Sequence, residues 1–406
     1  MKLLRITAKG LPLFKETLTI DFFAQQRVDS SKNDTLYKLF SFGTTSIYLN
    51  NAISFVGINA SGKTTTLKVI AFIIEMLNYQ SINNCPHNKI LEDLQEEETV
   101  TFETYFYCRN HTLNKLKTTI KKCYDDQKLE KKYIIDDEKA WSKSIEKIKT
   151  KKNMFEFDEK DFILERDKDA DFLLEDVSIA MAILKKNKDC KMFYLDLMEL
   201  TNHTWLRIQG DYPAELIEFL DPSVEYVRFT KDNEGNLSTS KESIRLKFKD
   251  RDEIILRDPR ELSHYLSSGT IKGINIFMNA ICTFLTSGYL IIDELENHFN
   301  KEIVATLIRF FMDSKVNENG GTLIFSTHYV ELLDEFDRND CIYIVRNRDG
   351  ISTQNLSSIL KRNDIKKSEA YESGFLEGTV PMYDAYINLK TRICKFRGEQ
   401  IEWRIR

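Results

Sequence analysis

Glycine and proline are scarce in this sequence, and the places where they are missing are informative. The 406 residues include 15 glycines and 6 prolines, and residues 87–209 contain neither. Turns in such a stretch must be built from Asn, Asp and Lys, so its composition favours long helices with some strand. The same stretch is highly charged, and its lysine run at 143–152 is typical of a solvated helix face.

Long apolar runs, paired cysteines and a basic excess are also missing. No stretch approaches the ~18 consecutive apolar residues of a membrane span, and the N-terminus lacks a signal-peptide pattern. The seven cysteines are scattered without a C-x-x-C pair, which argues against a disulfide framework or a zinc site and favours the reducing cytoplasm. With 58 basic and 63 acidic residues, the net charge is −5, so nucleic-acid binding would need a local basic patch.

Clear periodicity appears on either side of this stretch and in its first part. Residues 2–8 and 18–23 alternate like paired strands, and 98–108 with 113–123 predicts a hairpin. Residues 47–56 predict a strand that runs into a glycine loop. The remaining expected elements are a helix at 64–77, helices at 270–286 and 301–314, and buried strands at YLIIDE, TLIFST and CIYIVRN. Buried strands alternating with helices indicate an α/β core with a largely parallel sheet.

The clearest motif is GINASGKT, from Gly57 to Thr64, which fits G-x-x-x-x-G-K-[ST]. It lies between a predicted strand and a predicted helix, which is the setting of a phosphate-binding loop. Backbone N–H groups of such a loop, and the N-terminus of the helix after it, hold phosphate groups. We expect Lys63 to reach the β- and γ-phosphates of ATP and Thr64 to bind Mg²⁺. The expected nucleotide contacts are Gly57, Asn59, Ala60, Ser61, Gly62, Lys63, Thr64 and Thr65.

Acidic and basic side chains follow two of the predicted buried strands. YLIIDE ends in Asp293 and Glu294, and FSTHY places His328 after the next strand. We expect Asp293 to be the second protein ligand of Mg²⁺ and Glu294 to orient or deprotonate the attacking water. A neighbouring parallel strand would bring His328 to the γ-phosphate. The expected catalytic residues are Glu294, His328 and Lys63.

LSSGT, from Leu266 to Thr270, precedes the helix expected at 270–286. Its hydroxyls and free backbone N–H groups offer an anion site, although a segment of this kind alone predicts only a capping turn. In this order with the phosphate loop, YLIIDE and FSTHY, it becomes one of four motifs that together are diagnostic of a family.

The phosphate loop, LSSGT, YLIIDELENH and FSTHY, in that order, resemble the ATP-binding cassette (ABC) superfamily. The corresponding motifs there are Walker A, the signature, Walker B and the switch histidine. Two nucleotide-binding domains of that superfamily sandwich ATP, so the resemblance implies a homodimer or higher homo-oligomer. It also implies that Ser267, Ser268 and Gly269 contact the nucleotide held by the opposite chain.

Within the superfamily, the chain resembles the stand-alone OLD, RecF and SMC-like group. The span between Gly62 and Gly269 is longer than in a transporter cassette, and there is no long heptad run. GINASGKTTTLKVI and SEAYESGFLEGTVPMY are similar to ATPases of antiphage abortive-infection systems of the RloA, AbiL and AriA types. The resemblance implies a slow ATPase that acts as a sensor or regulatory subunit for a separately encoded nuclease or toxin.

The expected organisation has four parts. Residues 1–125 form the first part of the ATPase core, 126–240 an inserted and mainly helical segment, 241–350 the second part of the core, and 351–406 a helical, basic tail. The tail has no D-x-D pattern, so we expect no nuclease in this chain. The basic and aromatic side chains of the tail suit docking on a partner, packing on its own domain, or weak DNA binding. These residues are Lys390, Arg392, Lys395, Phe396, Arg397, Trp403, Arg404 and Arg406.

Two other functions and two assignments stay open at this point. The chain could be a RecF- or SMC-like DNA-repair ATPase, or a nucleotide-locked scaffold with little turnover. The Q-loop glutamine has only Gln80 and Gln95 as candidates. The adenine-stacking candidates are Phe14, Phe22 and Phe23, with core packing as the alternative.

Overall fold

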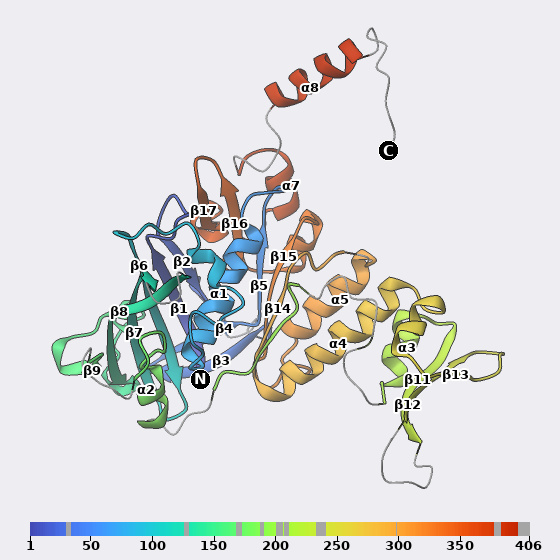
Figure 1. Cartoon of the computed structure of the whole chain (residues 1–406), viewed down its shortest axis with the longest axis horizontal. Helices are drawn as coiled ribbons and strands as arrows, with labels where there is room; N and C mark the ends of the chain where they lie inside the picture. Colours follow the sequence, from blue (N-terminus) through green and yellow to red (C-terminus); the bar gives the residue numbers. More distant parts are fainter. Residues whose placement is uncertain are drawn as a thin grey trace.

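A computed structural model describes residues 1–29, 34–125, 130–167, 173–186, 191–199, 206, 211–232, 241–297, 299–376 and 383–396. Two six-stranded sheets form the body of the protein, with a three-stranded sheet and a two-stranded hairpin beside them. Figure 1 shows helix α1 (Lys63–Leu77) between the two large sheets, and helices α4 (Ser268–Thr286) and α5 (Lys301–Met312) on the far side of one of them. None of the described helices is both long and apolar enough to span a membrane.

The core sheet has the strand order β10-β14-β15-β5-β16-β17. Its strands run parallel except β17, which is antiparallel to β16. The bounds are β10 Tyr194–Asp196, β14 Tyr289–Ile292, β15 Thr322–Thr327, β5 Ala52–Val56, β16 Ile342–Asn347 and β17 Ile351–Asn355. All residues of β5, β14 and β15 are buried, as expected for strands covered on both faces. The predicted α/β core with a largely parallel sheet is confirmed.

Alternate residues of the core strands belong to two different hydrophobic clusters. In β5, Ile53 and Phe55 pack in the cluster that contains α1 and the second large sheet, whereas Ala52 and Val56 pack with α4 and α5. This alternation follows from the period of two in a strand. Helix α1 is apolar around most of its circumference because it is enclosed between two sheets.

The second large sheet is antiparallel, with the order β2-β1-β6-β7-β8-β9. Its strands are β2 Leu18–Asp21, β1 Lys2–Lys9, β6 Thr99–Cys108, β7 Thr112–Asp125, β8 Glu130–Ser144 and β9 Phe162–Glu165. The predicted strand pair near the N-terminus and the predicted β6–β7 hairpin are confirmed. The strand expected at 47–56 is divided into β4 (Thr45–Asn50), which pairs with β3 (Leu36–Phe42), and β5.

The prediction of a mainly helical segment at 126–240 is wrong for the described residues. They contain strands β8, β9, β10 and β11 (Val224–Asp232), and their α-helices are α2 (Ala180–Lys186) and α3 (Ala214–Leu220). The β7–β8 hairpin also crosses the boundary expected between residues 125 and 126. A long hairpin needs neither glycine nor proline within its strands, so the scarcity of both residues did not distinguish strand from helix.

The lysine run at 143–152 is likewise not a solvated helix face. Lys143 is the second-last residue of β8 and is only 7% exposed. Its ammonium group donates hydrogen bonds to the backbone carbonyls of Asn153 and Glu156. The run therefore includes a lysine that fixes the turns after β8.

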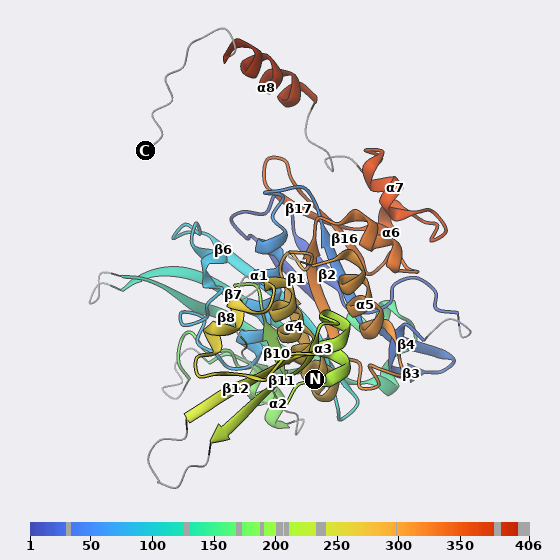
Figure 2. The same cartoon turned by 90° about the vertical axis from the view of Figure 1, so that its right-hand side faces the viewer.

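A small arm and the C-terminal helices complete the described chain. Strands β11, β12 (Lys241–Phe248) and β13 (Ile254–Leu256) form an antiparallel sheet that packs with α3 and the first half of α4. Helices α6 (Leu356–Ile359) and α7 (Lys367–Glu372) follow β17. Figures 1 and 2 show α8 (Tyr383–Phe396) apart from the rest of the protein. The expected tail residues Arg397, Trp403, Arg404 and Arg406 lie outside the described residues.

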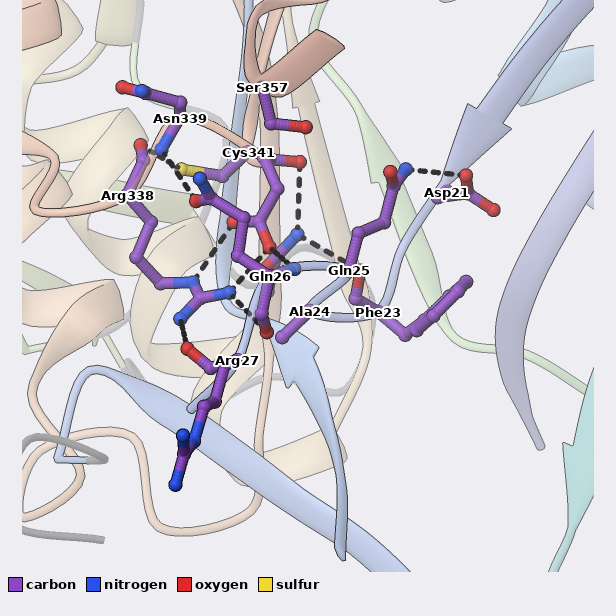
Figure 3. A network of polar contacts seen from close by, with 12 residues as sticks. Asp21, Phe23, Ala24, Gln25, Gln26, Arg27, Arg338, Asn339, Cys341 and Ser357 are labelled. Atoms are coloured by element: carbon purple, nitrogen blue, oxygen red, sulfur yellow. Dashed lines mark hydrogen bonds and ion pairs between the residues drawn. The ribbon is translucent and has the colours of Figure 1, made fainter. Parts of the chain in front are cut away.

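A polar network joins the segment after β2 to the start of β16 (Figure 3). The Arg338 guanidinium donates to the Gln26 carbonyl at 3.0 Å and to an Asp340 carboxylate oxygen at 2.5 Å. The Gln26 backbone N–H donates to the same Asp340 oxygen at 2.8 Å. Because β5 and β16 are parallel, this network lies at the opposite edge of the core sheet from the phosphate loop.

Candidate active site

A cleft of about 670 Å³ lies at the edge of the core sheet where β5, β14 and β15 end. Carboxyl ends of parallel strands are the usual place for a ligand in an open α/β sheet. Residues 59–65, Glu294 and His328 line the cleft. Pro12, Leu13 and Ile351 form an apolar wall beside the loop.

The loop at 57–62 has a backbone that only certain residues tolerate. Gly62 has φ +98°, and a Cβ atom there would lie 2.6 Å from the Ile351 side chain. At Gly57, a Cβ atom would lie 2.4 Å from the Val345 carbonyl oxygen. The loop leads directly into α1, which has no capping side chain and no acidic residue in its first turn. Its free N–H groups and positive dipole end are therefore suited to an anion.

Lys63 is the first residue of α1, and its ammonium group reaches back over the loop. It donates to the carbonyl of Gly57 at 2.9 Å and to that of Ile58 at 3.2 Å. Burial lowers the pKa of Lys63, while the nearby carboxylates of Asp293, Glu296 and Glu294 oppose that shift.

Thr64 and Asp293 come from separate elements and meet at the cleft. The Thr64 hydroxyl donates to Asp293 Oδ2 at 2.6 Å, and the Ser326 hydroxyl donates to Asp293 Oδ1. A hydroxyl and a carboxylate are oxygen ligands of the kind that Mg²⁺ takes. In the described part of the chain, no group of three or more His, Cys, Asp or Glu side chains could hold a metal. A magnesium ion held by Thr64 and Asp293 would thus need phosphate oxygens and water to complete its shell, which is its common mode of binding.

Glu294 follows Asp293 in a left-handed backbone conformation with φ +47°. The Ser326 hydroxyl oxygen accepts the Glu294 backbone N–H at 2.8 Å. One carboxylate oxygen, Oε2, accepts from the Asn297 side-chain amide at 2.5 Å, and the other, Oε1, lies 3.8 Å from His328 Nε2. The side chain is 45% exposed. One oxygen is therefore held by the protein, while the carboxylate still reaches the cleft.

His328 lies between the loop lysine and Glu294 because β15 lies between β5 and β14 in the sheet. Its Nδ1 atom is 3.5 Å from Lys63 Nζ. Its backbone N–H donates to Glu296 Oε1 at 2.6 Å, which fixes the strand end that carries the ring. The other carboxylate oxygen of Glu296 is buried without a hydrogen-bond partner among the described residues.

The expected signature residues do not line this cleft. Ser267 caps α4, where its hydroxyl oxygen accepts the Thr270 backbone N–H at 3.0 Å. Ser267 and Ser268 are exposed, and Gly269 is partly exposed. Within one chain, the structure does not bring these residues together with the loop.

Sequence reasoning missed several residues of the site. Glu296 and Asn297 lie within DELENH, and Ser326 lies within FSTHY, so the motifs themselves could have identified them. The apolar wall had no local signal. The candidates for stacking on adenine do not line the cleft. Phe22 and Phe23 are core residues, 2% and 4% exposed, and Phe14 packs against the cluster that contains Phe22. Gln80 and Gln95 do not line the cleft either.

The fold and the site define a P-loop nucleoside-triphosphatase domain. Residues 53–334 match the family described as "AAA domain, putative AbiEii toxin, Type IV TA system". This is more than half of the chain, and the protein belongs to that family. The matched span begins in β5 and ends shortly after His328, so it contains the phosphate loop and the strand ends that carry Asp293, Glu294 and His328. No curated protein matches the chain.

Proposed function

We propose that this protein is a slow, Mg²⁺-dependent ATPase of the ABC type, and that it dimerises around ATP to control a separately encoded effector in antiphage defence. The observation that carries the ATPase proposal is the convergence of Lys63, Thr64, Asp293, Glu294 and His328 at one cleft. The family description, with its toxin–antitoxin context, supports an effector partner.

The loop and α1 would bind the phosphates through backbone N–H groups and the Lys63 ammonium. Thr64 and Asp293 would hold Mg²⁺, which neutralises phosphate charge when bound. Glu294 Oε1 would accept the proton of a water whose oxygen attacks the γ-phosphorus, as the bond from that phosphorus to the ADP oxygen breaks. His328 Nε2, close to the same carboxylate oxygen, would orient the water and the γ-phosphate.

The first prediction concerns Glu294→Gln. The change removes the base and leaves the anion site and the metal ligands in place, so ATP binding should persist while turnover falls ~10²–10⁴-fold. Fluorescent-nucleotide binding and phosphate release measure the two effects separately. Glu372→Gln, at an exposed position on α7, is the matched control and should behave as the parent chain. Parent-like hydrolysis by Glu294→Gln would show that another group activates the water.

The assignment to the RloA, AbiL and AriA types remains part of this proposal and rests on the resemblance of the loop and of SEAYESGFLEGTVPMY. Co-expression of this protein with a nuclease or toxin encoded beside its gene would test the assignment. The parent chain should change the toxicity of the effector, whereas the Glu294→Gln chain should not.

The DNA-repair function is the second candidate because α8 exposes basic side chains. Lys390, Arg392 and Lys395 are all exposed there. Binding of DNA through a few phosphate contacts weakens steeply with salt. We therefore expect only weak, salt-sensitive DNA binding; tight binding at ~0.2 M salt would favour the DNA-repair function instead.

A further inference from the structure

Helix α4 carries a buried lysine that faces the turn after the acidic strand end. Lys272 is 4% exposed, its ammonium group donates to the Asn297 carbonyl at 2.5 Å, and it lies 4.9 Å from the centre of the Phe299 ring. Desolvation lowers the pKa of Lys272 to about 8, although Glu296 and Glu294 oppose the shift. A cation is unfavourable at a buried position unless specific partners compensate it, and an apolar side chain would pack there more simply.

Asn297 connects this lysine to the proposed general base. Its side-chain amide donates to Glu294 Oε2 at 2.5 Å, and its backbone N–H donates to the Glu294 carbonyl at 3.0 Å. Lys272 therefore holds the main chain of the same residue whose side chain holds the Glu294 carboxylate. The remaining carboxylate oxygen, Oε1, is left on the side of His328.

Lys272 also lies close to the exposed start of α4. It follows Ser268 by about one helical turn, and the residues between them belong to the same helix. A helix transmits displacement along its axis because its backbone hydrogen bonds are continuous. A contact made at Ser267 or Ser268 would thus reach Lys272 without passing through a loop.

We propose that Lys272 and Asn297 form a positioning relay that couples the N-terminal end of α4 to the Glu294 carboxylate. The relay rests on the proposed ATPase function and adds its regulation. A molecule that docks on Ser267 or Ser268 therefore orients the Glu294 carboxylate in the cleft of the same chain. Lys272 and Asn297 are positioning residues that act through Glu294 and do not contact the substrate.

The test compares turnover with nucleotide affinity in Lys272→Met. The variant keeps most of the length of the unbranched side chain but cannot donate to the Asn297 carbonyl, so Glu294 loses its fixed orientation. We expect kcat to fall about 10- to 100-fold, as small displacements of catalytic groups do. The KM for ATP and the affinity for a fluorescent ATP analogue should stay within about twofold, since the phosphate loop is untouched. Lys272→Arg, which keeps a cationic donor, should restore part of kcat. Lys366→Met, at an exposed lysine before α7, is the control and should resemble the parent.

A second set of variants shows whether the effect passes through Asn297. Asn297→Ala removes the amide and should lower kcat by itself. In that background, Lys272→Met should add little, because both changes release the same carboxylate. Fully additive losses would overturn the relay, as would parent-like kcat in Lys272→Met or an equal loss of kcat and nucleotide affinity. If Lys272→Met does not fold, Asn297→Asp provides the same readout, because a carboxylate at that place repels Glu294 and should lower kcat alone.

Failure of the relay and failure of the ATPase proposal look different. A parent chain that binds but does not hydrolyse ATP rejects the proposed function, and the relay with it. A parent chain that turns over ATP, together with an equally active Lys272→Met, rejects only the relay.

Discussion

Asp293 and Glu294 are adjacent residues of like charge with different contacts, because β14 ends at Ile292 and the backbone then turns at Glu294. Asp293 directs its carboxylate to the Thr64 and Ser326 hydroxyls, whereas Glu294 turns into a left-handed conformation and faces Asn297 and His328. A positive φ at a non-glycine residue is strained by ~1–3 kcal/mol and persists only where surrounding contacts hold it. Here the Ser326 hydroxyl contacts both residues.

Lys2 gives a residue-scale prediction about pH. It is 6% exposed in β1, and its ammonium group donates to the backbone carbonyls of Ser287 and Gly320. Burial lowers the pKa of Lys2 from 10.5 to about 7. Between these values the unfolded chain binds more protons than the folded chain, so this lysine makes the free energy of unfolding rise with pH in that window.

Lys2→Met should remove this dependence. The free energy of unfolding of the variant, relative to that of the parent, should be highest near pH 6, where the parent buries a charge. It should be lowest near pH 10. Thermal unfolding of both chains across this range measures the difference, with Lys9→Met, at an exposed position on the same strand, as the control. Parallel pH curves for Lys2→Met and the parent would mean that Lys2 titrates alike in the folded and unfolded chains.

At the scale of elements, strand β8 depends on a buried acid. Glu138 is 0% exposed, and its carboxylate accepts from the hydroxyls of Thr118 and Ser178 and from the backbone N–H of Ile179. The guanidinium of Arg166, the residue after β9, lies 3.7 Å from the Glu138 carboxylate. One side chain thus joins β7, β8 and the start of α2.

Glu138→Ala should destabilise the fold by ~3 kcal/mol or more, because it leaves Arg166 buried without its carboxylate. Chemical denaturation measures this, and Glu165→Ala, at an exposed acid of β9, should have little effect.

Because Glu138 joins β8 to the rest of the fold, deleting residues 140–215 should impair ATP binding as well as any effector function. A deletion that still binds ATP normally would show that β8 to β10 are dispensable for the core.

The elements that sequence could predict are those with a local signal. β5, β14 and β15 are mostly apolar, are buried throughout and end in recognisable motifs, so both the sheet and the residues at its edge could be predicted. β8 was not, because its alternation is interrupted by charged residues and by the buried Glu138, whose partners come from elsewhere in the chain. The apolar wall of the cleft was inaccessible for a similar reason. Leu13 and Ile351 meet through a backbone hydrogen bond of 2.8 Å between segments far apart in the sequence.

At the scale of the whole molecule, the phosphate loop and the segment 267–269, which was predicted to be a signature motif, are separate surfaces of one chain. The cleft is open and lacks the hydroxyls and N–H groups that Ser267, Ser268 and Gly269 present at the exposed end of α4. A second copy could supply them to the γ-phosphate, which is the arrangement implied by the ABC resemblance. The chain whose Ser267 and Ser268 contact that nucleotide would then also reposition its own Glu294, through Lys272 and Asn297.

The last prediction follows from this arrangement. Ser268→Arg places bulk and charge where a nucleotide of the opposite chain would dock, so it should leave the first binding event intact and prevent nucleotide-dependent association. Sedimentation velocity with ATP should show a heavier species for Glu294→Gln, which retains ATP, and should lose it when Ser268→Arg is added. Lys366→Met in the same background should not affect association. An oligomeric state that ignores both ATP and the change at Ser268 would mean that the cleft works within one chain, and the exposed end of α4 would then need another partner.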